Sequence, residues 1–360
     1  MSFEVHHYKS IGKKHALEGS VCQDAVDSYQ DEHIAITAVA DGHGSSQYFR
    51  SHLGSQFAVE GTIELLKTFY QVHPNYLDAQ KHLENLKLQI LVEWNNRVEM
   101  DYKQNPIKCE ELHHLSEKQQ QRINDNYFTA YGTTLLASLW CKQYLLVFRI
   151  GDGIIAKMDP SLEVKQLLVD QEEQGGSLTD SMCQEDAYTR MQVEIVDNPN
   201  TTALAICSDG VINGFGNLYK FNTYLFKPLL IERFRYDQAS MANILNQAVT
   251  QIAGAFSSSD DSSLAISYVV PTTSPSLDFY DCEKMRTLLE LDNLDQVDID
   301  NQLKLYKTID NDALLTFTAF IHNQELLNPT ERQLRLYQTL VTSHQPLEAL
   351  VKFTDQVIKE

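Results

Sequence analysis

Residues 35–44 of the 360-residue chain read AITAVADGHG, a continuous apolar run that ends at an Asp-Gly pair. A short apolar run bounded by Asp and Gly is typical of a strand buried on both faces. The pattern recurs at residues 144–153, YLLVFRIGDG, and at residues 203–210, ALAICSDG. The sequence therefore predicts three buried strands, each with an aspartate at or just beyond its end.

Two more acidic elements accompany these strands: Asp24, and the pair Asp260-Asp261 directly before SSLAISYVV. One Asp-Gly pair alone would favour a hairpin turn. The repetition, and the helical pattern that follows Asp41, argue against that interpretation for the whole set. Strand ends in a sandwich meet at one edge, where several carboxylates would repel one another unless a cation bound between them. Hard cations such as Mg²⁺ and Mn²⁺ prefer oxygen ligands. The sequence therefore predicts a divalent-metal site, which suits the hydrolysis of phosphate esters.

The pattern of the remaining elements predicts an α+β sandwich rather than a doubly wound sheet. Beyond a Pro- and Ser-containing linker at residues 271–276, helical periodicity continues to the end. We therefore expect a first domain over residues 1–272 and an all-helical appendage of unknown role over residues 276–360. The expected strands are Ile34–Ala40, Thr133–Cys141, Tyr144–Ile150, Gln192–Val196, Ala203–Cys207 and Leu264–Val270, and the expected helices of the first domain are Gln47–Tyr70, Leu77–Tyr102 and Ala239–Phe256.

The composition narrows the classes of partner. A formal net charge of -20 argues against nucleic acid and against anionic membranes, because no excess of Lys and Arg exists to neutralise phosphates. The six cysteines form no C-x-x-C pair, which favours free thiols in a reducing compartment. With no apolar leader or membrane span expected, the prediction is a cytoplasmic protein. The adjacent pairs His6-His7 and His113-His114 are expected on the surface.

The ordered motifs as a set resemble one family. They are GKKH…CQDA (12–25), VADGHG (39–44), YGTTLLA (131–137), RIGDG (149–153), CSDGV (207–211) and DDSSLA (260–265). Their order resembles the type 2C protein phosphatases, and the first of them resembles the bacterial subgroup. The resemblance covers about residues 11–270. It implies two packed antiparallel sheets flanked by helices, an α/β/β/α sandwich. It also implies a metal-dependent protein serine/threonine phosphatase, in which a hydroxide held between two Mn²⁺ or Mg²⁺ ions attacks the phosphoryl group. It also implies a phosphorylated protein substrate, with a cognate serine/threonine kinase as a further candidate partner.

The resemblance also implies a set of metal ligands. Asp41 would bridge two ions, and the carbonyl of Gly42 would bind one of them. Asp24 would lie beside the pair, binding directly or through water, and Asp152 with Asp209 would offer a position for a third ion. The full implied set is Asp24, Asp41, Gly42, Asp152, Asp209 and Asp260.

Other positions have supporting roles in the family. His43 would be the general acid that protonates the leaving seryl oxygen, a role suited to imidazole near neutral pH. Thr134 matches a position that supports hydrogen bonds near the metals. Glu172, Glu173, Gly175 and Gly176 fall in a region that often forms a flap beside the family's active site.

The chain departs from the family pattern at three positions near these motifs. Gly19 stands where many members have an Arg that binds the substrate phosphate, so Lys13, Lys14 and His15 are the candidates to replace it. Gln23 replaces a common Glu. Asp261 replaces a common Asn, which adds a negative charge.

These departures leave a second function open. The chain could be a catalytically weak, phosphatase-like module that binds phosphoproteins or regulates them. Phosphopeptide binding without phosphate release would distinguish this alternative. A dinucleotide site at Gly151-Asp152-Gly153 is disfavoured, because Pro160 follows where a long helix should continue.

Overall fold

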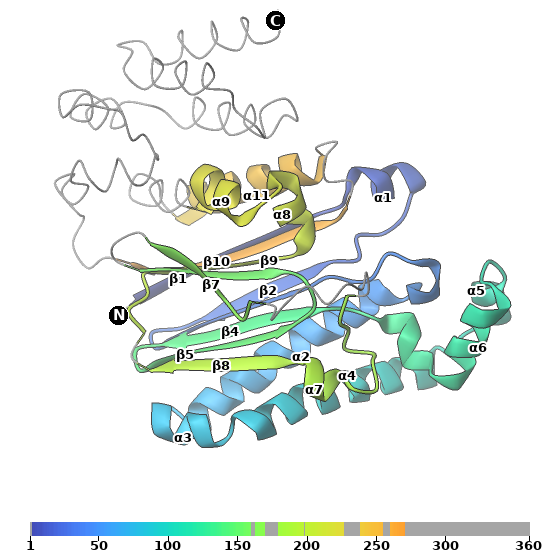
Figure 1. Ribbon diagram of the computed structural model, residues 1–360, viewed down its shortest axis with the longest axis horizontal. Coiled ribbons are helices and arrows are strands. Elements are labelled where there is room, and N and C mark those ends of the chain that lie inside the picture. The colour runs from blue at the N-terminus through green and yellow to red at the C-terminus, as the bar shows by residue number, and fades with distance from the viewer. Residues whose placement is uncertain are drawn as a thin grey trace, which may run out of the picture.

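The computed structural model describes residues 2–159, 163–169, 179–197, 199–226, 238–254 and 260–270. Two five-stranded antiparallel sheets lie face to face between layers of helices (Figure 1). One sheet has the order β1-β10-β9-β6-β7 and the other has the order β2-β3-β4-β5-β8. This confirms the predicted sandwich. The strands are β1 (Ser2–Ser10), β2 (Ala25–Gln30), β3 (Ile34–Ala40), β4 (Leu135–Cys141), β5 (Tyr144–Ile150), β6 (Ile154–Met158), β7 (Val164–Leu167), β8 (Gln192–Asp197), β9 (Ala203–Cys207) and β10 (Ser262–Val270).

Helices cover the outer face of each sheet. The long helices α2 and α4 pack on the sheet that contains β3, and α8 and α11 pack on the sheet that contains β9. At one end of the sandwich lie α1, α5 and α6, and α3 lies at the other (Figure 1). The helices are α1 (Lys13–Glu18), α2 (Ser51–Val72), α3 (Tyr76–Lys81), α4 (Leu83–Gln104), α5 (Cys109–Leu112), α6 (Glu117–Asp125), α7 (Ala187–Arg190), α8 (Asp209–Phe215), α9 (Leu218–Phe221) and α11 (Gln238–Gly254), with short helical turns η1 (Ser46–Tyr48), η2 (Tyr127–Tyr131) and η3 (Asn222–Phe226).

The layered arrangement explains why the central strands are apolar at every position. In β3, Ile36 and Ala38 face the helices, whereas Ala35 and Val39 face the other sheet. Alternate side chains of a strand point to opposite faces, so a strand between two apolar layers needs apolar residues on both. All seven residues of β3 are buried.

The structure corrects several sequence-based boundaries. The N-terminal strand β1 was not predicted, because its stability comes from pairing with β10 from Ser2↔Val270 to Ser10↔Ser262 rather than from a local apolar run. Strands β2, β6 and β7 were also missed; β2 and β7 carry mixed polar sequences and β6 is short. The expected helix Leu77–Tyr102 is two helices, α3 and α4, divided at His82.

The exposure of the histidine pairs and the state of the cysteines follow from the structure. His113 and His114 are exposed as expected, but His6 is buried, and its Nε2 lies 3.1 Å from the hydroxyl of Tyr268. The five described cysteines are free thiols. The helical appendage (276–360) and the proposed flap (172–176) lie outside the described residues.

Strand pairing brings the strand ends that carry the predicted aspartates to one edge of the sandwich. Ala25 pairs with Ala40, so the residues just before β2 lie beside those just after β3. In the other sheet, Cys207 pairs with both Leu264 and Ile154. The loops that precede β6 and β10 therefore lie beside the loop that follows β9. Each of these loops carries one of the predicted aspartates.

Candidate metal centre

Asp41 is fixed through its backbone by the strand beside it. Its N–H donates to Thr134 Oγ1 at 2.9 Å, and its carbonyl accepts from the Thr134 N–H at 2.9 Å and from the Thr133 hydroxyl at 2.8 Å. Strand β4 begins at Leu135, two residues later than the sequence predicted. Thr134 therefore has a visible supporting role, which is to hold the backbone of Asp41.

Gly42 follows in a space that has no room for a side chain. A Cβ at this position would lie 2.6 Å from the carbonyl oxygen of Gln23 and 2.9 Å from the backbone of Ser51. Gly42 thus brings the start of α2 and the segment before β2 against the loop after β3. This close packing explains the glycine at this position of the motif.

Asp24 joins the two sheets. Its side chain is 1% exposed, and its Oδ2 accepts a hydrogen bond of 2.6 Å from the hydroxyl of Ser263 on β10. Ser263 is itself held by Ser208: the Ser263 N–H donates to Ser208 Oγ at 3.0 Å, and the Ser208 N–H donates to the Ser263 carbonyl at 3.0 Å. The other carboxylate oxygen of Asp24 is buried and has no hydrogen-bond partner.

Asp209 begins α8 directly after β9, and its buried Oδ1 also has no hydrogen-bond partner. Its other oxygen accepts from Asn213 Nδ2 at 3.0 Å. The next residue, Gly210, is packed so closely that a Cβ there would lie 2.0 Å from the carbonyl oxygen of Asp261. The start of α8 and the loop before β10 are therefore in direct contact.

Burial raises the pKa values of three of these aspartates, and neighbouring carboxylates contribute. Burial raises the pKa of Asp24 to about 7, against the hydrogen bond from Ser263 and with a contribution from Asp261. Burial also raises the pKa of Asp41 well above its ordinary value, and the charges of Asp24 and Asp209 raise it further. Burial raises the pKa of Asp209, the neighbouring Asp41 side chain lowers it, and the charges of Asp152 and Asp260 raise it further. Without a counter-charge, this group of acids is under strong mutual repulsion.

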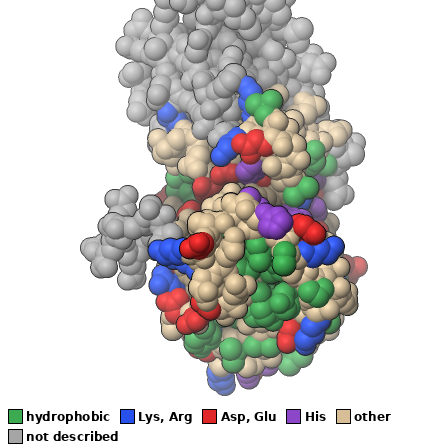
Figure 2. All heavy atoms as spheres, turned by 90° about the vertical axis from the view of Figure 1, so that its right-hand side faces the viewer, with side chains coloured by type: hydrophobic (Ala, Val, Ile, Leu, Met, Phe, Trp, Pro, Cys, Tyr) green, Lys and Arg blue, Asp and Glu red, His purple; other side chains and the backbone are tan. Residues whose placement is uncertain are grey.

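The other two aspartates of the predicted set lie at the exposed rim. Asp152 is exposed and accepts a hydrogen bond of 2.7 Å from the Thr179 hydroxyl, and Asp260 is exposed at the start of the loop before β10. Figure 2 views the molecule from the end that carries α1 and shows acidic side chains with histidine beside them across the middle of this face.

The residues fit divalent cations. Two of the carboxylates have orphaned buried oxygens, and the donor set is carboxylate oxygen, which hard cations prefer. The donor atoms of the acidic site do not form a tight group of three. Within the described residues, one set of three His, Cys or acidic side chains has donor atoms that all lie within 4.8 Å of one another. That set is His73, Asp78 and His82, which lie elsewhere.

His43 lies beside this acidic group. Its backbone N–H donates to the carbonyl of Gly132 at 3.1 Å. Its ring packs on the ring of Tyr48, with the ring centroids 4.8 Å apart. A Cβ on Gly132 would lie 2.6 Å from the ring of Tyr48 and 3.0 Å from that of His43. Burial lowers the pKa of His43, and the charge of Asp152 opposes the lowering. The imidazole is thus fixed in place, with an acidic residue of the rim near it.

Asp261 has a role different from that of the other acids. Its Oδ1 accepts from the Gly12 N–H at 2.7 Å, and its Oδ2 accepts from the Gln23 N–H at 2.6 Å. His15 Nδ1 lies 3.0 Å from Oδ1, an ion-pair distance. Both oxygens of Asp261 therefore hold the segment before β2, which an Asn with one acceptor oxygen could not do for both N–H groups.

The candidate phosphate-binding residues lie on α1. His15 is buried, and its Nε2 lies 3.9 Å from the point that a Cβ on Gly44 would occupy, next to His43. Lys13 is half-buried and Lys14 is exposed. The structure thus brings His15 close to the loop that carries Asp41.

The alternative interpretations of the Asp-Gly pairs do not hold. β3 leads from Asp41 into η1 and α2, and Asp209 begins a helix. Gly151-Asp152-Gly153 joins β5 to β6, which belong to different sheets, so it is no hairpin. It leads into a strand rather than a helix, which excludes the dinucleotide-binding arrangement.

A family comparison agrees with this architecture. Residues 11–248 match the family model described as "Protein phosphatase 2C". The chain belongs to the protein phosphatase 2C family. The resemblance seen in the sequence is thereby confirmed, and with it the expectation of a protein phosphatase, whose substrates are phosphoproteins and whose family generally depends on Mn²⁺ or Mg²⁺.

Solved structures with a similar arrangement include bacterial phosphatases. A bacterial serine phosphatase is 15% identical, with 75% of this chain and 99% of that chain covered and a TM-score of 0.49. The serine/threonine phosphatase Stp1 from Staphylococcus aureus is 16% identical, with 75% and 96% covered and a TM-score of 0.48. RsbX in complex with magnesium is 15% identical, with 74% and 96% covered and a TM-score of 0.39. No curated protein matched the chain. Among the described residues, no helix combines the length and apolar character needed to cross a membrane.

Several residues of the site were missed in the sequence. Ser208 and Ser263 connect the acids, and Gly132 and Tyr48 position His43. The two serines stand inside quoted motifs, CSDGV and DDSSLA, so their proximity to the acids was available as a signal. Their partner was not, because Ser263 and Asp24 are separated by 239 residues.

Proposed function

We propose that this protein phosphatase 2C member is a metal-dependent protein serine/threonine phosphatase that hydrolyses phosphomonoesters. One observation carries the proposal: Asp24, Asp41 and Asp209 come from three distant segments, burial raises the pKa of each, and Asp24 and Asp209 each have a buried oxygen without a partner. A protein gains little stability from carboxylates crowded in this way, so a bound cation is the best account of them.

Two Mg²⁺ or Mn²⁺ ions, when bound, would activate water as the nucleophile and neutralise the phosphoryl oxygens. Asp41, Asp209 and Asp260 would hold them together with the Gly42 carbonyl. Asp24, which is buried, would bind the ions directly or through water. Asp152 with Asp209 would offer a position for a third ion. The ion identity and number are part of the proposal.

The protein's own groups would complete the reaction. His43 would donate a proton to the seryl or threonyl oxygen as its bond to phosphorus breaks, which keeps the leaving group from departing as an alkoxide. His15, together with Lys13 and Lys14, would supply the positive charge that the family's missing Arg supplies elsewhere. The nearness of His15 Nε2 to Gly44 supports that assignment.

We also propose that the phosphatase domain extends to about residue 272. The family match ends at residue 248, but β10 pairs with both β1 and β9 and carries Ser263. Without β10, Asp24 would lose its hydrogen-bond donor, and Asp260 and Asp261 would be absent. The segment 276–360 is proposed as a separate unit, and a cognate kinase is a proposed partner.

The test compares hydrolysis of p-nitrophenyl phosphate and of a phosphoserine peptide by the full chain with Mn²⁺. Asp209→Asn should abolish most of the metal-dependent activity. Asp197→Asn, at an exposed position that ends β8, is the matched control and should leave it unchanged. Equal activity of wild type and Asp209→Asn would refute the proposal. Tight phosphopeptide binding without phosphate release would instead favour the phosphoprotein-binding alternative.

A further inference from the structure

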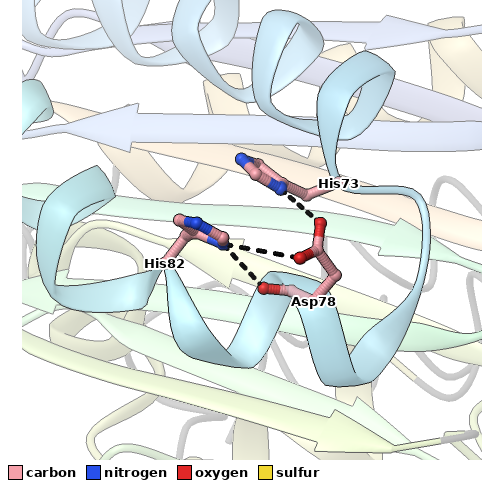
Figure 3. Close-up of side chains that lie close together, drawn as sticks. All are labelled: His73, Asp78 and His82. Carbon is pink, nitrogen blue, oxygen red and sulfur yellow. Dashed lines mark hydrogen bonds and ion pairs between the residues drawn. The ribbon is translucent and has the colours of Figure 1, made fainter.

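A second cluster of metal-ligand side chains lies far from the acidic site. His73, Asp78 and His82 belong to the connection that leads from α2 through α3 to α4, and their side chains converge on one point (Figure 3). His73 Nδ1 lies 2.6 Å from Asp78 Oδ2, and His82 Nδ1 lies 3.9 Å from Asp78 Oδ1. One donor atom from each residue lies within 4.8 Å of the other two. The spacing is His-x4-Asp-x3-His.

The local structure fixes the cluster. The carbonyl of His73 accepts a hydrogen bond of 2.9 Å from the Tyr144 hydroxyl, and its ring packs at 4.9 Å on that of Phe69. His82 separates α3 from α4, and its Nδ1 lies 2.9 Å from the backbone carbonyl of Asp78. The two imidazole rings are stacked with centroids 4.1 Å apart and both present Nδ1 to Asp78 (Figure 3).

We propose that His73, Asp78 and His82 bind one divalent transition-metal ion of the Zn²⁺ class through the two Nδ1 atoms and a carboxylate oxygen of Asp78. Imidazole with carboxylate suits Zn²⁺, Co²⁺ and Ni²⁺, whereas Mg²⁺ prefers oxygen ligands alone. In the metal-free structure His82 Nδ1 donates to the Asp78 carbonyl, so metal binding would break this bond and leave the proton of each neutral imidazole on Nε2. Water would complete the coordination, because the side chains of His82 and Asp78 are 41% and 46% exposed.

The spacing of the donors supports a single ion. Zinc bonds of about 2.0–2.1 Å place tetrahedral ligands about 3.3–3.4 Å apart. The two measured donor separations, 2.6 Å and 3.9 Å, lie on either side of that value. Binding would require the two stacked rings to rotate so that both Nδ1 lone pairs point at the ion, a side-chain rearrangement at the ends of α2 and α3.

The simpler explanation is a metal-free ion pair in which Asp78 serves as an acidic residue in the first turn of α3. In that arrangement the Asp78 carboxylate pairs with His73, and the Asp78 backbone carbonyl accepts a hydrogen bond of 2.9 Å from His82 Nδ1. The carboxylate is 2.6 Å from one imidazole and 3.9 Å from the other, so it bonds only one of two stacked rings. A cation would use both rings, and two imidazolium ions in the same stack would repel each other.

The cluster is independent of the acidic site. Helix α2 begins at Ser51, which packs on Gly42, and ends next to His73. Its 22 residues span about 33 Å at 1.5 Å per residue. An ion at the cluster would thus link α2 to α4 at the end of the molecule opposite the acidic site. It would not contact the residues that take part in the proposed reaction.

Isothermal titration of the full chain with Zn²⁺ or Ni²⁺, in excess Mg²⁺, tests the proposal, with the visible spectrum of bound Co²⁺ as a second readout. We expect one saturable site, retained in Asp209→Asn. The affinity for the metal should fall in both His82→Gln and Asp78→Asn. The loss should be at least roughly 10- to 100-fold, which is what removing a residue that only supports a ligand costs. Because these side chains are partly exposed, both variants should fold, and circular dichroism without metal checks this.

His113→Gln is the matched control. His113 is also an exposed histidine, and with the exposed Cys109 four residues earlier it could offer the metal an alternative pair of ligands. It should bind the metal as wild type does. The proposal is overturned if wild type shows no saturable site under these conditions, or if His82→Gln binds with unchanged affinity. Loss of the site in Asp209→Asn or in His113→Gln would likewise overturn it, because the ion would then be held elsewhere.

Discussion

The crowded carboxylates make a quantitative prediction about the metal-free protein. The pKa of Asp24 rises from an ordinary 3.8 to about 7, mainly through burial. An acid with a raised pKa holds more protons in the folded than in the unfolded state between these two values. The contribution of Asp24 to the free energy of unfolding of the metal-free protein should therefore be fully present below about pH 4 and be lost as the pH rises through 7.

The size of the effect follows from the shift. A difference of roughly three pKa units corresponds to about 4 kcal/mol, at about 1.4 kcal/mol per unit, lost by pH 8. This is an upper limit for Asp24, because its titration is linked to that of Asp41. Asp24→Asn removes the charge but keeps an oxygen that can accept the hydrogen bond from Ser263. The variant should be more stable than wild type at pH 8 without metal, by up to about 4 kcal/mol.

The assay is urea unfolding in EDTA at several values between pH 5 and pH 8, followed by the same series with Mg²⁺ or Mn²⁺. Wild type should regain at pH 8 the stability lost without metal, because an ion that binds only the folded state stabilises it. Asp24→Asn should gain less from the ion. Asp197→Asn, exposed at the far end of β8, should follow wild type. Parallel pH curves for wild type and Asp24→Asn in EDTA would refute the reasoning.

Three further predictions concern single residues of the site. His43→Gln should lower phosphopeptide hydrolysis by about 10²- to 10⁴-fold but lower p-nitrophenyl phosphate hydrolysis much less, since nitrophenolate leaves without protonation; equal losses in steady-state rates would contradict a general acid. Asp261→Asn should reduce the free energy of unfolding by about 1–3 kcal/mol, because one buried N–H loses its acceptor; an unchanged urea midpoint would contradict this. Gly42→Ala, whose Cβ would lie 2.6 Å from the Gln23 carbonyl, should cost about 1–3 kcal/mol. Gly254→Ala, with nothing within 4 Å, is its control, and similar thermal midpoints in the two would disprove the packing argument.

The sequence by itself determined the fold class and the acidic residues, because these depend on local pattern. Continuous apolar strands such as β3 require a covering layer on each face, which already indicates a sandwich between helices. An aspartate at the end of such a strand lies at the sheet edge wherever the strand pairs. For that reason Asp41, Asp152 and Asp209 were located correctly at strand ends without any knowledge of their neighbours.

Only the tertiary structure decided which groups meet. The bond from Ser263 to Asp24 and the bonds from Gly12 and Gln23 to Asp261 join segments more than 200 residues apart, and no local pattern specifies such pairs. Strand β1 likewise depends on its long-range partner β10. The cluster at His82 depends on the break between α3 and α4, since a continuous helix would place its side chains by helical spacing alone. Sequence fixes which groups are available, whereas their distances follow from packing between remote elements.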